Sequence, residues 1–467
     1  MAKTTCEQLA QWAMAASWES VRPEAAERIK LHLLDALGCA VGALRTKPID
    51  AIRREQAMAG VGGECTQIAD GNRTSPEYAA FYNSALVRYL DFMDTYVAPG
   101  EACHPSDNLG AVLAGADLAG ASGRDFLTAL LVAYQVQCRL TGSGVPIMRR
   151  GFDHTIQLAV SQTAGLCRVL GLSNQQAAHA IAISTAGGLG LAASRAGNPV
   201  PQWKGMAAAA TAFSTVHNTR LARAGITGPL GVFESPLGLE HMLGEHFKIN
   251  WSREELDAVL SCSIKRYNAE FHAQSCIDGL IEMREKYAIA PAHIRTVEIE
   301  IFKVAYEMIG GGKYVDPKSV STKEDADHSL HYLAAVALVD GKVGPPQFEE
   351  HRIRSGDVQT LLARVTVKPN FIYTKSYPGS MRVRMNVAMQ NGKRFVHKKK
   401  DYAGFYRRPM TKDEVVAKFR SLAAGAMDTA LMRQIETCVF GLENRAVAEL
   451  LHILETVPLG GLKDIAA

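Results

Sequence analysis

The chain has 467 residues, of which 47% are hydrophobic and 21% charged, with 40 glycines and 18 prolines. This ordinary composition excludes a disordered chain, a collagen-like repeat and a coiled-coil rod, and the length favours more than one domain. The formal net charge of +4, spread over this length, indicates no nucleic-acid-binding surface, although it leaves room for a local basic pocket for an anionic substrate.

The first half of the chain predicts one helix after another. Apolar residues recur at helical spacing in seven segments: 20–43, 76–92, 108–121, 124–140, 158–170, 173–184 and 204–224. The last of these contains the run 206–210, whose small side chains allow neighbouring backbones to approach closely. Together these segments predict a buried helical bundle.

The pattern changes after about residue 261. Four segments alternate apolar and polar side chains as strands do: 297–302, 362–368, 381–389 and 393–399. The last two flank Asn391-Gly392, a strong signal for a β-hairpin. Helices are expected at 324–340, 411–424 and 427–454.

We therefore predict a mainly α fold with two domains. The larger domain is all-helical, spans 1–261 and is completed by C-terminal helices within 409–467. The smaller is an α+β lid domain at 262–408. No internal repeat is visible at the periods of solenoid proteins.

The nine cysteines are scattered, odd in number and never spaced as Cys-x-x-Cys. This pattern favours free thiols in a reducing compartment, and it argues against a thiolate zinc site or an iron–sulfur cluster. Residues 1–20 carry Glu7 and Glu19 and resemble no signal peptide, and no run of about 18 apolar residues predicts a membrane span. We expect a cytoplasmic protein.

The densest polar cluster lies at 90–108. Asp91 and Asp94 are three residues apart at a predicted helix end and can share a face, and Thr95 follows them. A loop then brings His104 just before Pro105. A histidine, a hydroxyl and carboxylates together suit proton transfer, but a capped corner between two helices explains the same residues.

Two further candidates follow. His154 precedes a predicted helix, whose dipole disfavours the imidazolium and favours a neutral base; its alternative role is a hydrogen bond to the backbone. Lys204 begins the small-residue helix and adds positive charge to a helix N-terminus, which suits an anion site. The alternative for Lys204 is a solvated side chain.

The segment 265–278 lies where the two predicted domains meet. Lys265, Arg266, His272 and Gln274, together with Glu270, can face a cleft that binds a small molecule. An amphipathic helix start explains the segment equally well. His328 and His331 have helical i, i+3 spacing, but no further ligand completes a metal site, so no metal is expected.

Several motifs spread nearly end to end resemble the MmgE/PrpD family. They are LLDALGCAVGAL, RYLDFMDTY with HPSDN, GFDHT, WKG, GITGPLGVFESPLGL and DADHSLHYLAAVALVDG. The segment AEFHAQ at 269–274 resembles the dehydratase branch, because the decarboxylase branch has a histidine where Gln274 aligns. Asn268 departs from the proline usual in the family.

The resemblance implies a homodimer without a metal or other cofactor, acting on a small polycarboxylate rather than on nucleic acid or membrane. It carries catalytic roles onto Asp91, His104, His154 and Lys204. Substrate contacts are expected at Thr95, Lys265, Arg266, His272, Gln274 and Tyr332.

The implied activity is dehydration of a hydroxy-polycarboxylate such as 2-methylcitrate, in propionate metabolism. Side chains would then do the work of a metal: one removes a proton beside a carboxylate and another protonates the departing hydroxyl. We assign the base and the acid to His104 and His154, in either order, with Asp91 orienting one of them and Lys204 balancing the charge of the enolised carboxylate.

Three alternatives remain open at this stage. An epimerase or isomerase would use the same proton abstraction and return the proton to carbon. A decarboxylase of the cis-aconitate type is the second. The third is a catalytically silent relative that binds a polycarboxylate without turnover.

Overall fold

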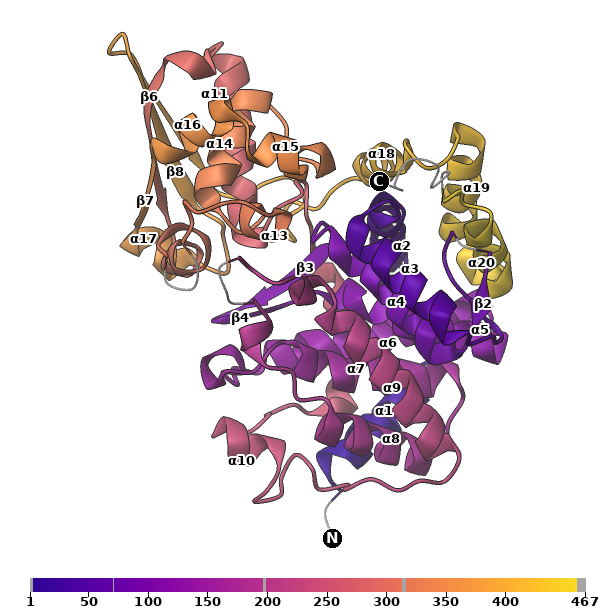
Figure 1. The fold of residues 1–467 in the computed structure, drawn as a ribbon. Coiled ribbons are helices and arrows are strands. Elements are labelled where there is room, and N and C mark those ends of the chain that lie inside the picture. Colours follow the sequence, from indigo (N-terminus) through magenta and orange to yellow (C-terminus); the bar gives the residue numbers. More distant parts are fainter. Residues whose placement is uncertain (1–2, 70, 196–198, 313–315, 460–467) are drawn as a thin grey trace. The chain divides into compact units, whose positions relative to one another are not determined.

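A computed structural model describes residues 3–69, 71–195, 199–312 and 316–459. The chain divides into two compact units (Figure 1). The helical unit comprises Met1–Ala192, Gly205–Cys262 and Thr411–Ala467, and the α+β unit comprises Ala193–Lys204 and Ser263–Met410. The mainly α fold with a smaller α+β part is thereby confirmed.

Helices make up most of the helical unit. They are α1 Thr5–Ala15, α2 Pro23–Ala43, α3 Lys47–Ala59, α4 Pro76–Tyr89, α5 Leu109–Ala119, α6 Gly123–Thr141, α7 Thr155–Val169, α8 Asn174–Gly187, α9 Ala207–Arg223, α10 Leu239–Leu243, α18 Lys412–Ala423, α19 Thr429–Phe440 and α20 Val447–Glu455. Helix α6 packs on α7, α4 packs on α5 and α9, and α18 packs on α2. The C-terminal helices therefore complete the core that the first half of the chain begins.

Short strands interrupt these helices at two places. Strands β1 Cys65–Thr66 and β2 Arg73–Thr74 pair with each other, and β3 Asp94–Ala98 pairs antiparallel with β4 Glu101–Cys103. The second hairpin follows α4 and precedes α5, so it projects from the packed pair of helices. It carries several of the polar residues that the sequence singles out.

A glycine allows α5 to approach α4 closely. An ideal Cβ built on Gly110 would lie 2.2 Å from Ser84 Oγ and 2.5 Å from Ser84 N, which is far inside contact distance. Only a residue without a side chain fits there. The close approach sets where the chain between α4 and α5, residues 90–108, must begin and end.

The α+β unit is built on a four-stranded sheet in the order β7-β6-β8-β9. Its elements are β5 Ser263–Ile264, α11 Gln274–Lys286, β6 Ile294–Ile301, α12 Lys303–Ala305, α13 Lys323–Ala326, α14 Leu330–Asp340, α15 Glu350–Ile353, α16 Gly356–Ala363, β7 Val365–Pro369, α17 Phe371–Ser376, β8 Val383–Met389 and β9 Arg394–Lys399. Strand β6 runs parallel to β7 and antiparallel to β8. Helices α11 and α14 pack against each other and against the sheet.

The strand predictions are confirmed with small shifts. The hairpin of β8 and β9 turns at Asn391-Gly392, where Gly392 has φ +85°. The helix predicted at 324–340 is instead two helices, α13 and α14, because Thr322 and Ser329 each cap a separate N-terminus. The hairpin of β3 and β4 has no counterpart among the predicted elements.

Residues of the loop before Lys204 also differ from expectation. The sequence assigned 193–204 to the helical domain, whereas their contacts assign them to the α+β unit. The Val200 N–H donates to Asp325 Oδ1 at 3.0 Å, and Lys204 Nζ donates to Asp327 Oδ1 at 2.8 Å. Buried carboxylates at the end of α13 therefore hold this segment.

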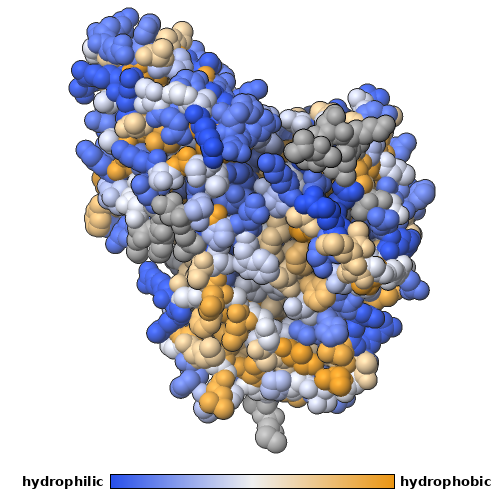
Figure 2. Space-filling model, viewed as in Figure 1, coloured by the Kyte–Doolittle hydropathy of each residue, from blue (hydrophilic) through white to orange (hydrophobic). Residues whose placement is uncertain are grey.

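All nine cysteines are described, buried and free of disulfides. Among the described helices, none combines the length and the hydropathy that a membrane span needs. Figure 2 shows apolar side chains gathered on one face of the helical unit, in the part where Figure 1 labels α8 and α10. Exposed apolar residues of that unit include Leu237, Met242 and Leu191.

Candidate active site

The turn after α4 places Asp91 in an uncommon backbone conformation. Helix α4 ends at Tyr89, and Asp91 has φ +55°, the left-handed region that glycine normally occupies. Arg88, which is buried, donates from Nη1 to Asp91 Oδ1 at 2.7 Å. The Arg88 ion pair helps to hold this turn, and Asp91 shares no helix face with Asp94, which begins β3.

His104 follows β4 and is held by the backbone of the paired strand. Its Nδ1 lies 2.8 Å from the Asp94 carbonyl oxygen and 3.2 Å from Thr95 Oγ1. A carbonyl oxygen can only accept, so Nδ1 carries a proton, and any proton that the ring takes up must go to Nε2. The ring is partly exposed. This arrangement suits a base that acts through Nε2.

The Asp94 carboxylate anchors the start of β3. It accepts hydrogen bonds from the Ser106 N–H and hydroxyl at 3.0 and 2.7 Å and from the Tyr134 hydroxyl at 2.9 Å. His32 Nδ1 lies 2.7 Å away. Burial acts to raise the pKa of Asp94, but the bonds from His32 and Ser106 outweigh it and lower the pKa. Asp94 is therefore a buried anion directly before the peptide that orients His104.

His154 lies between two carboxylates at the start of α7. Its Nδ1 is 3.0 Å from Asp153 Oδ1 and its Nε2 is 3.3 Å from Asp107 Oδ2. A carboxylate therefore faces each nitrogen of the ring. The sequence considered only the helix dipole and showed neither of these neighbours. The rings of His154 and His104 lie 5.5 Å apart, edge to face.

Arg88 and Glu101 complete the charged groups around the two histidines. Arg88 Nε lies 3.8 Å from Asp107 Oδ2, so this one guanidinium faces two carboxylates. Burial acts to lower the pKa of Arg88, but the charges of Asp91 and Asp107 outweigh this effect, and the pKa is raised. Glu101, in β4, accepts from the Met148 N–H at 3.1 Å. Burial raises the pKa of Glu101 to about 7.

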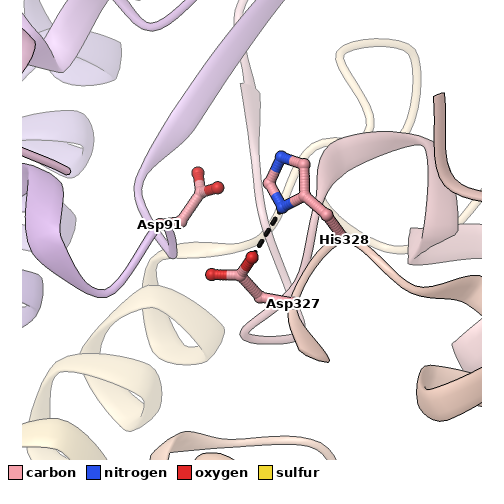
Figure 3. Close-up of side chains that lie close together, drawn as sticks. All are labelled: Asp91, Asp327 and His328. Carbon is pink, nitrogen blue, oxygen red and sulfur yellow. Dashed lines mark hydrogen bonds and ion pairs between the residues drawn. The ribbon is translucent and has the colours of Figure 1, made fainter. Parts of the chain in front are cut away.

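The α+β unit holds a second charged cluster, around Asp327. This carboxylate is fully buried in the break between α13 and α14, and Figure 3 shows its bond to the His328 ring, 2.6 Å long. Lys204 Nζ lies 2.8 Å from Asp327 Oδ1, and Lys323 Nζ lies 2.8 Å from Oδ2. Burial opposes ionisation, but the two lysines hold the pKa of Asp327 well below its usual range.

His272 belongs to the same unit and lies close to the Asp327 cluster. Its Nδ1 is 2.6 Å from Glu270 Oε1 and its Nε2 is 3.0 Å from the Tyr377 hydroxyl. The Glu270 N–H donates to the Asp327 carbonyl oxygen at 2.9 Å, so this group adjoins the Asp327 cluster. Lys265 is buried, and its charge acts on Glu270.

Two residues that were predicted to contact the substrate form hydrogen bonds with backbone groups inside the α+β unit. Gln274 accepts from the Arg266 and Tyr267 N–H groups at 2.9 and 3.0 Å and donates to the Tyr267 carbonyl at 2.9 Å. Tyr332 is fully buried in α14 and its hydroxyl donates to the Gln347 carbonyl. These contacts support packing roles for both side chains, because their polar atoms already bind backbone groups.

Two family domains cover most of the chain. The MmgE/PrpD N-terminal domain matches residues 7–252 and the MmgE/PrpD C-terminal domain matches residues 267–442. The chain belongs to the MmgE/PrpD family. This assignment agrees with the motifs that carried the resemblance.

Relatives within the MmgE/PrpD family carry two different activities in their names. The chain is 26% identical to the 2-methylcitrate dehydratase of Escherichia coli K12 over 74% of each chain. It is 27% identical to that of Cupriavidus necator, over 74% of this chain and 73% of the relative. It is also 27% identical to human cis-aconitate decarboxylase, over 82% of this chain and 80% of the relative.

The structure groups the predicted MmgE/PrpD site residues by unit. Asp91, Thr95, His104 and His154 belong to the helical unit, and Lys204, Lys265, Arg266, His272, Gln274 and Tyr332 belong to the α+β unit. Sequence reasoning did not single out Arg88, Glu101 or Asp107. The available signal was charge: Arg88 is a cation among apolar residues at 85–90.

Proposed function

We propose that this MmgE/PrpD member is a lyase that removes water from a hydroxy-polycarboxylate of the 2-methylcitrate type. The observation that carries the proposal is the His104–His154 pair, in which a backbone carbonyl oxygen binds Nδ1 of His104 and a carboxylate faces each nitrogen of His154. Relatives named 2-methylcitrate dehydratase support the lyase class. The two rings adjoin, at 5.5 Å between centroids, so one ligand can meet both.

In the proposed reaction His104 is the base. Its Nε2 takes a proton from the carbon beside a carboxylate, and the C–H electron pair forms the new double bond. The Asp94 anion, whose own carbonyl accepts from Nδ1, stabilises the imidazolium that results. Thr95, whose hydroxyl lies 3.2 Å from His104 Nδ1, is proposed to position the substrate.

His154 is the proposed acid. It gives a proton to the departing hydroxyl, so that the C–O bond breaks and water leaves. To complete the cycle, His154 regains a proton from solvent and His104 loses its proton to solvent; Asp107 and Asp153, which each face one nitrogen of the His154 ring, hold that ring in place. The partners of the two rings support this division of roles, which the sequence left open. Arg88 faces both Asp107 and Asp91, so its single positive charge offsets part of the negative charge beside the histidines.

We further propose that lysines bind the carboxylates of the substrate. Lys204 and Lys265 are both buried in the α+β unit. In the proposal Lys204 exchanges its bond to Asp327 for a bond to a substrate carboxylate. Arg266, which is partly exposed, is the third candidate. Replacing each lysine and measuring the Michaelis constant for a polycarboxylate tests these roles.

A decarboxylase of cis-aconitate is the second candidate function. The relatives named cis-aconitate decarboxylase are as similar to this chain as the dehydratases are. Such a reaction replaces a carboxylate by a proton, so it needs a proton donor but no departing hydroxyl. Product mass separates the two, because decarboxylation loses carbon dioxide and dehydration loses water.

The test is an assay of purified, chelator-treated protein with 2-methylcitrate, citrate and cis-aconitate. Ultraviolet absorbance follows the conjugated double bond, and mass spectrometry identifies the products. We expect an unsaturated acid to form from 2-methylcitrate at a rate that the chelator does not change. Loss of activity with chelator would refute side-chain catalysis without metal. Deuterium incorporated from solvent with no unsaturated product would indicate an epimerase instead.

A further inference from the structure

Three side chains of the α+β unit form a continuous hydrogen-bonded chain. Glu270 Oε1 lies 2.6 Å from His272 Nδ1, and the Tyr377 hydroxyl lies 3.0 Å from His272 Nε2. The remaining oxygen of Glu270 accepts from the His272 N–H at 2.7 Å. Both oxygens of the carboxylate and both nitrogens of the ring are therefore used, and the chain ends at a phenol.

Packing holds the three groups in this order. Glu270 and His272 are buried, whereas Tyr377 is partly exposed. The Tyr377 ring stacks on Phe302 with 4.6 Å between centroids and 11° between planes. His272 contacts the same Phe302 edge to face at 5.5 Å. Tyr377 follows α17, more than 100 residues along the chain from His272, so tertiary structure alone brings them together.

Neighbouring charges determine where the protons of these three hydrogen-bonded side chains lie. Burial acts to raise the pKa of Glu270, but His272, His328 and Lys265 outweigh it and lower the pKa. Burial and the Glu270 charge both raise the pKa of the Tyr377 phenol. An ionised Glu270 accepts from Nδ1–H, and a neutral Tyr377 donates to Nε2, which is the arrangement of a carboxylate–histidine pair that activates a hydroxyl.

We propose that Glu270, His272 and Tyr377 form a second proton-transfer site, in which Tyr377 exchanges the proton with the ligand. As the phenol oxygen takes a proton from the ligand, its own proton passes to His272 Nε2. The phenol stays neutral throughout, and Glu270 stabilises the imidazolium. The return step runs in reverse, so no proton is gained or lost overall.

The expected ligand is a carboxylate-bearing acid, and this part rests on the proposed function. The Glu270 N–H binds the Asp327 carbonyl, and Lys204 and Lys323 both donate to the Asp327 carboxylate. Two lysines that bind one buried carboxylate therefore lie next to the triad within its own unit, and a ligand carboxylate can compete for them. His272 acts through Tyr377, because its ring nitrogens are already bonded, rather than as the direct substrate contact that the sequence suggested.

The first experiment asks whether the chain of bonds exists in the free protein. Nitrogen-15 spectra of the imidazole side chains are recorded for the wild type and for Tyr377→Phe. We expect His272 to be the Nδ1–H form, with its Nε2 signal moving in the variant because the hydrogen bond is lost. An Nε2–H form, or no change in the variant, would overturn the proposal whether or not the protein turns over any acid tested.

The second experiment measures turnover of 2-methylcitrate by Tyr377→Phe and by its matched control, Tyr373→Phe in α17. Loss of the hydroxyl should lower kcat about 100-fold or more while KM changes less than threefold, and the control should match the wild type. A Tyr377→Phe variant within twofold of the wild type would overturn the proposal. An inert wild type would instead refute the proposed function, and the nitrogen-15 spectra would still decide the triad.

The pH profile of turnover distinguishes a role of Glu270 in proton transfer from a purely structural role. In Glu270→Gln the ring and phenol keep their neighbours, but the negative charge is gone. The imidazolium is then harder to form, so the acidic limb of the kcat profile should move to lower pH. An unchanged profile with a general loss of stability would contradict the relay.

Discussion

Glu101 offers a direct test of the electrostatics around the two histidines. The residue is 5% exposed, and burial raises the pKa of its carboxyl from 4.5 to about 7. That difference corresponds to about 3 kcal/mol by which ionised Glu101 destabilises the folded helical unit. Glu101→Gln resembles the protonated acid in shape and can still accept from the Met148 N–H. The variant should therefore be the more stable protein at pH 8.

The sign and the pH range follow from proton binding. Below about pH 4.5 Glu101 is protonated in the folded and unfolded chain, so replacing it changes no charge. Between about pH 4.5 and 7 only the folded chain keeps the proton, so the wild type loses stability as pH rises. The variant lacks this loss, so its advantage should grow by about 1.4 kcal/mol for each pH unit and level off above pH 7.

The assay is urea unfolding of both proteins at several pH values from 5 to 8, followed by far-ultraviolet circular dichroism. Taking the difference between the two proteins cancels the other titrating groups. Glu77→Gln is the control with the opposite sign. Although burial opposes it, backbone and Arg220 bonds lower the pKa of Glu77, so that variant should lose stability at neutral pH. A Glu101 difference that is independent of pH would refute the assignment.

Four further outcomes are expected. His104→Gln should lower kcat about 100-fold or more with an unchanged circular dichroism spectrum; near-normal turnover would exclude it as the base. Asp94→Asn should lower both kcat and the free energy of unfolding, the latter by about 1–3 kcal/mol, and stability equal to wild type would contradict the anchoring role. Gly110→Ala should destabilise by about 1–3 kcal/mol in urea unfolding because its methyl group meets Ser84, and no loss would show that the helices separate easily. Asp327→Asn should lower the melting temperature by removing the negative charge that buried Lys204 and partly exposed Lys323 share; an unchanged value would show that this charge does not stabilise the fold.

Local patterns in the sequence determined the class of fold and most of its elements. Apolar spacing predicted α2 and α4 to within a few residues, and Asn391-Gly392 predicted the hairpin of β8 and β9. Such features depend on neighbours within one helical turn or one hairpin, which the sequence displays directly. The same locality drew attention to His104 and His154, since both lie in short polar runs between helices.

Tertiary structure alone decided the partners of those residues. That Asp91 orients one of the two histidines stays a prediction, and the carboxylates that face His154 are Asp107 and Asp153. The proton on His104 Nδ1 follows from a carbonyl on the paired strand. Hydrogen bonds and burial depend on groups far apart in the chain, so spacing cannot show which carboxylate meets which ring.

The α+β unit shows the same division most clearly. His272 was recognised from its motif, but its partner Tyr377 comes from beyond α17. The sequence also predicted one continuous helix where the chain breaks and the Asp327 carbonyl accepts from the Glu270 N–H. Apolar residues keep helical spacing across 327–329, but Thr322 and Ser329 each cap a separate helix, so the segment divides into α13 and α14. The sequence therefore determined which residue types were present for proton transfer, and the folded chain decided which of them share a proton.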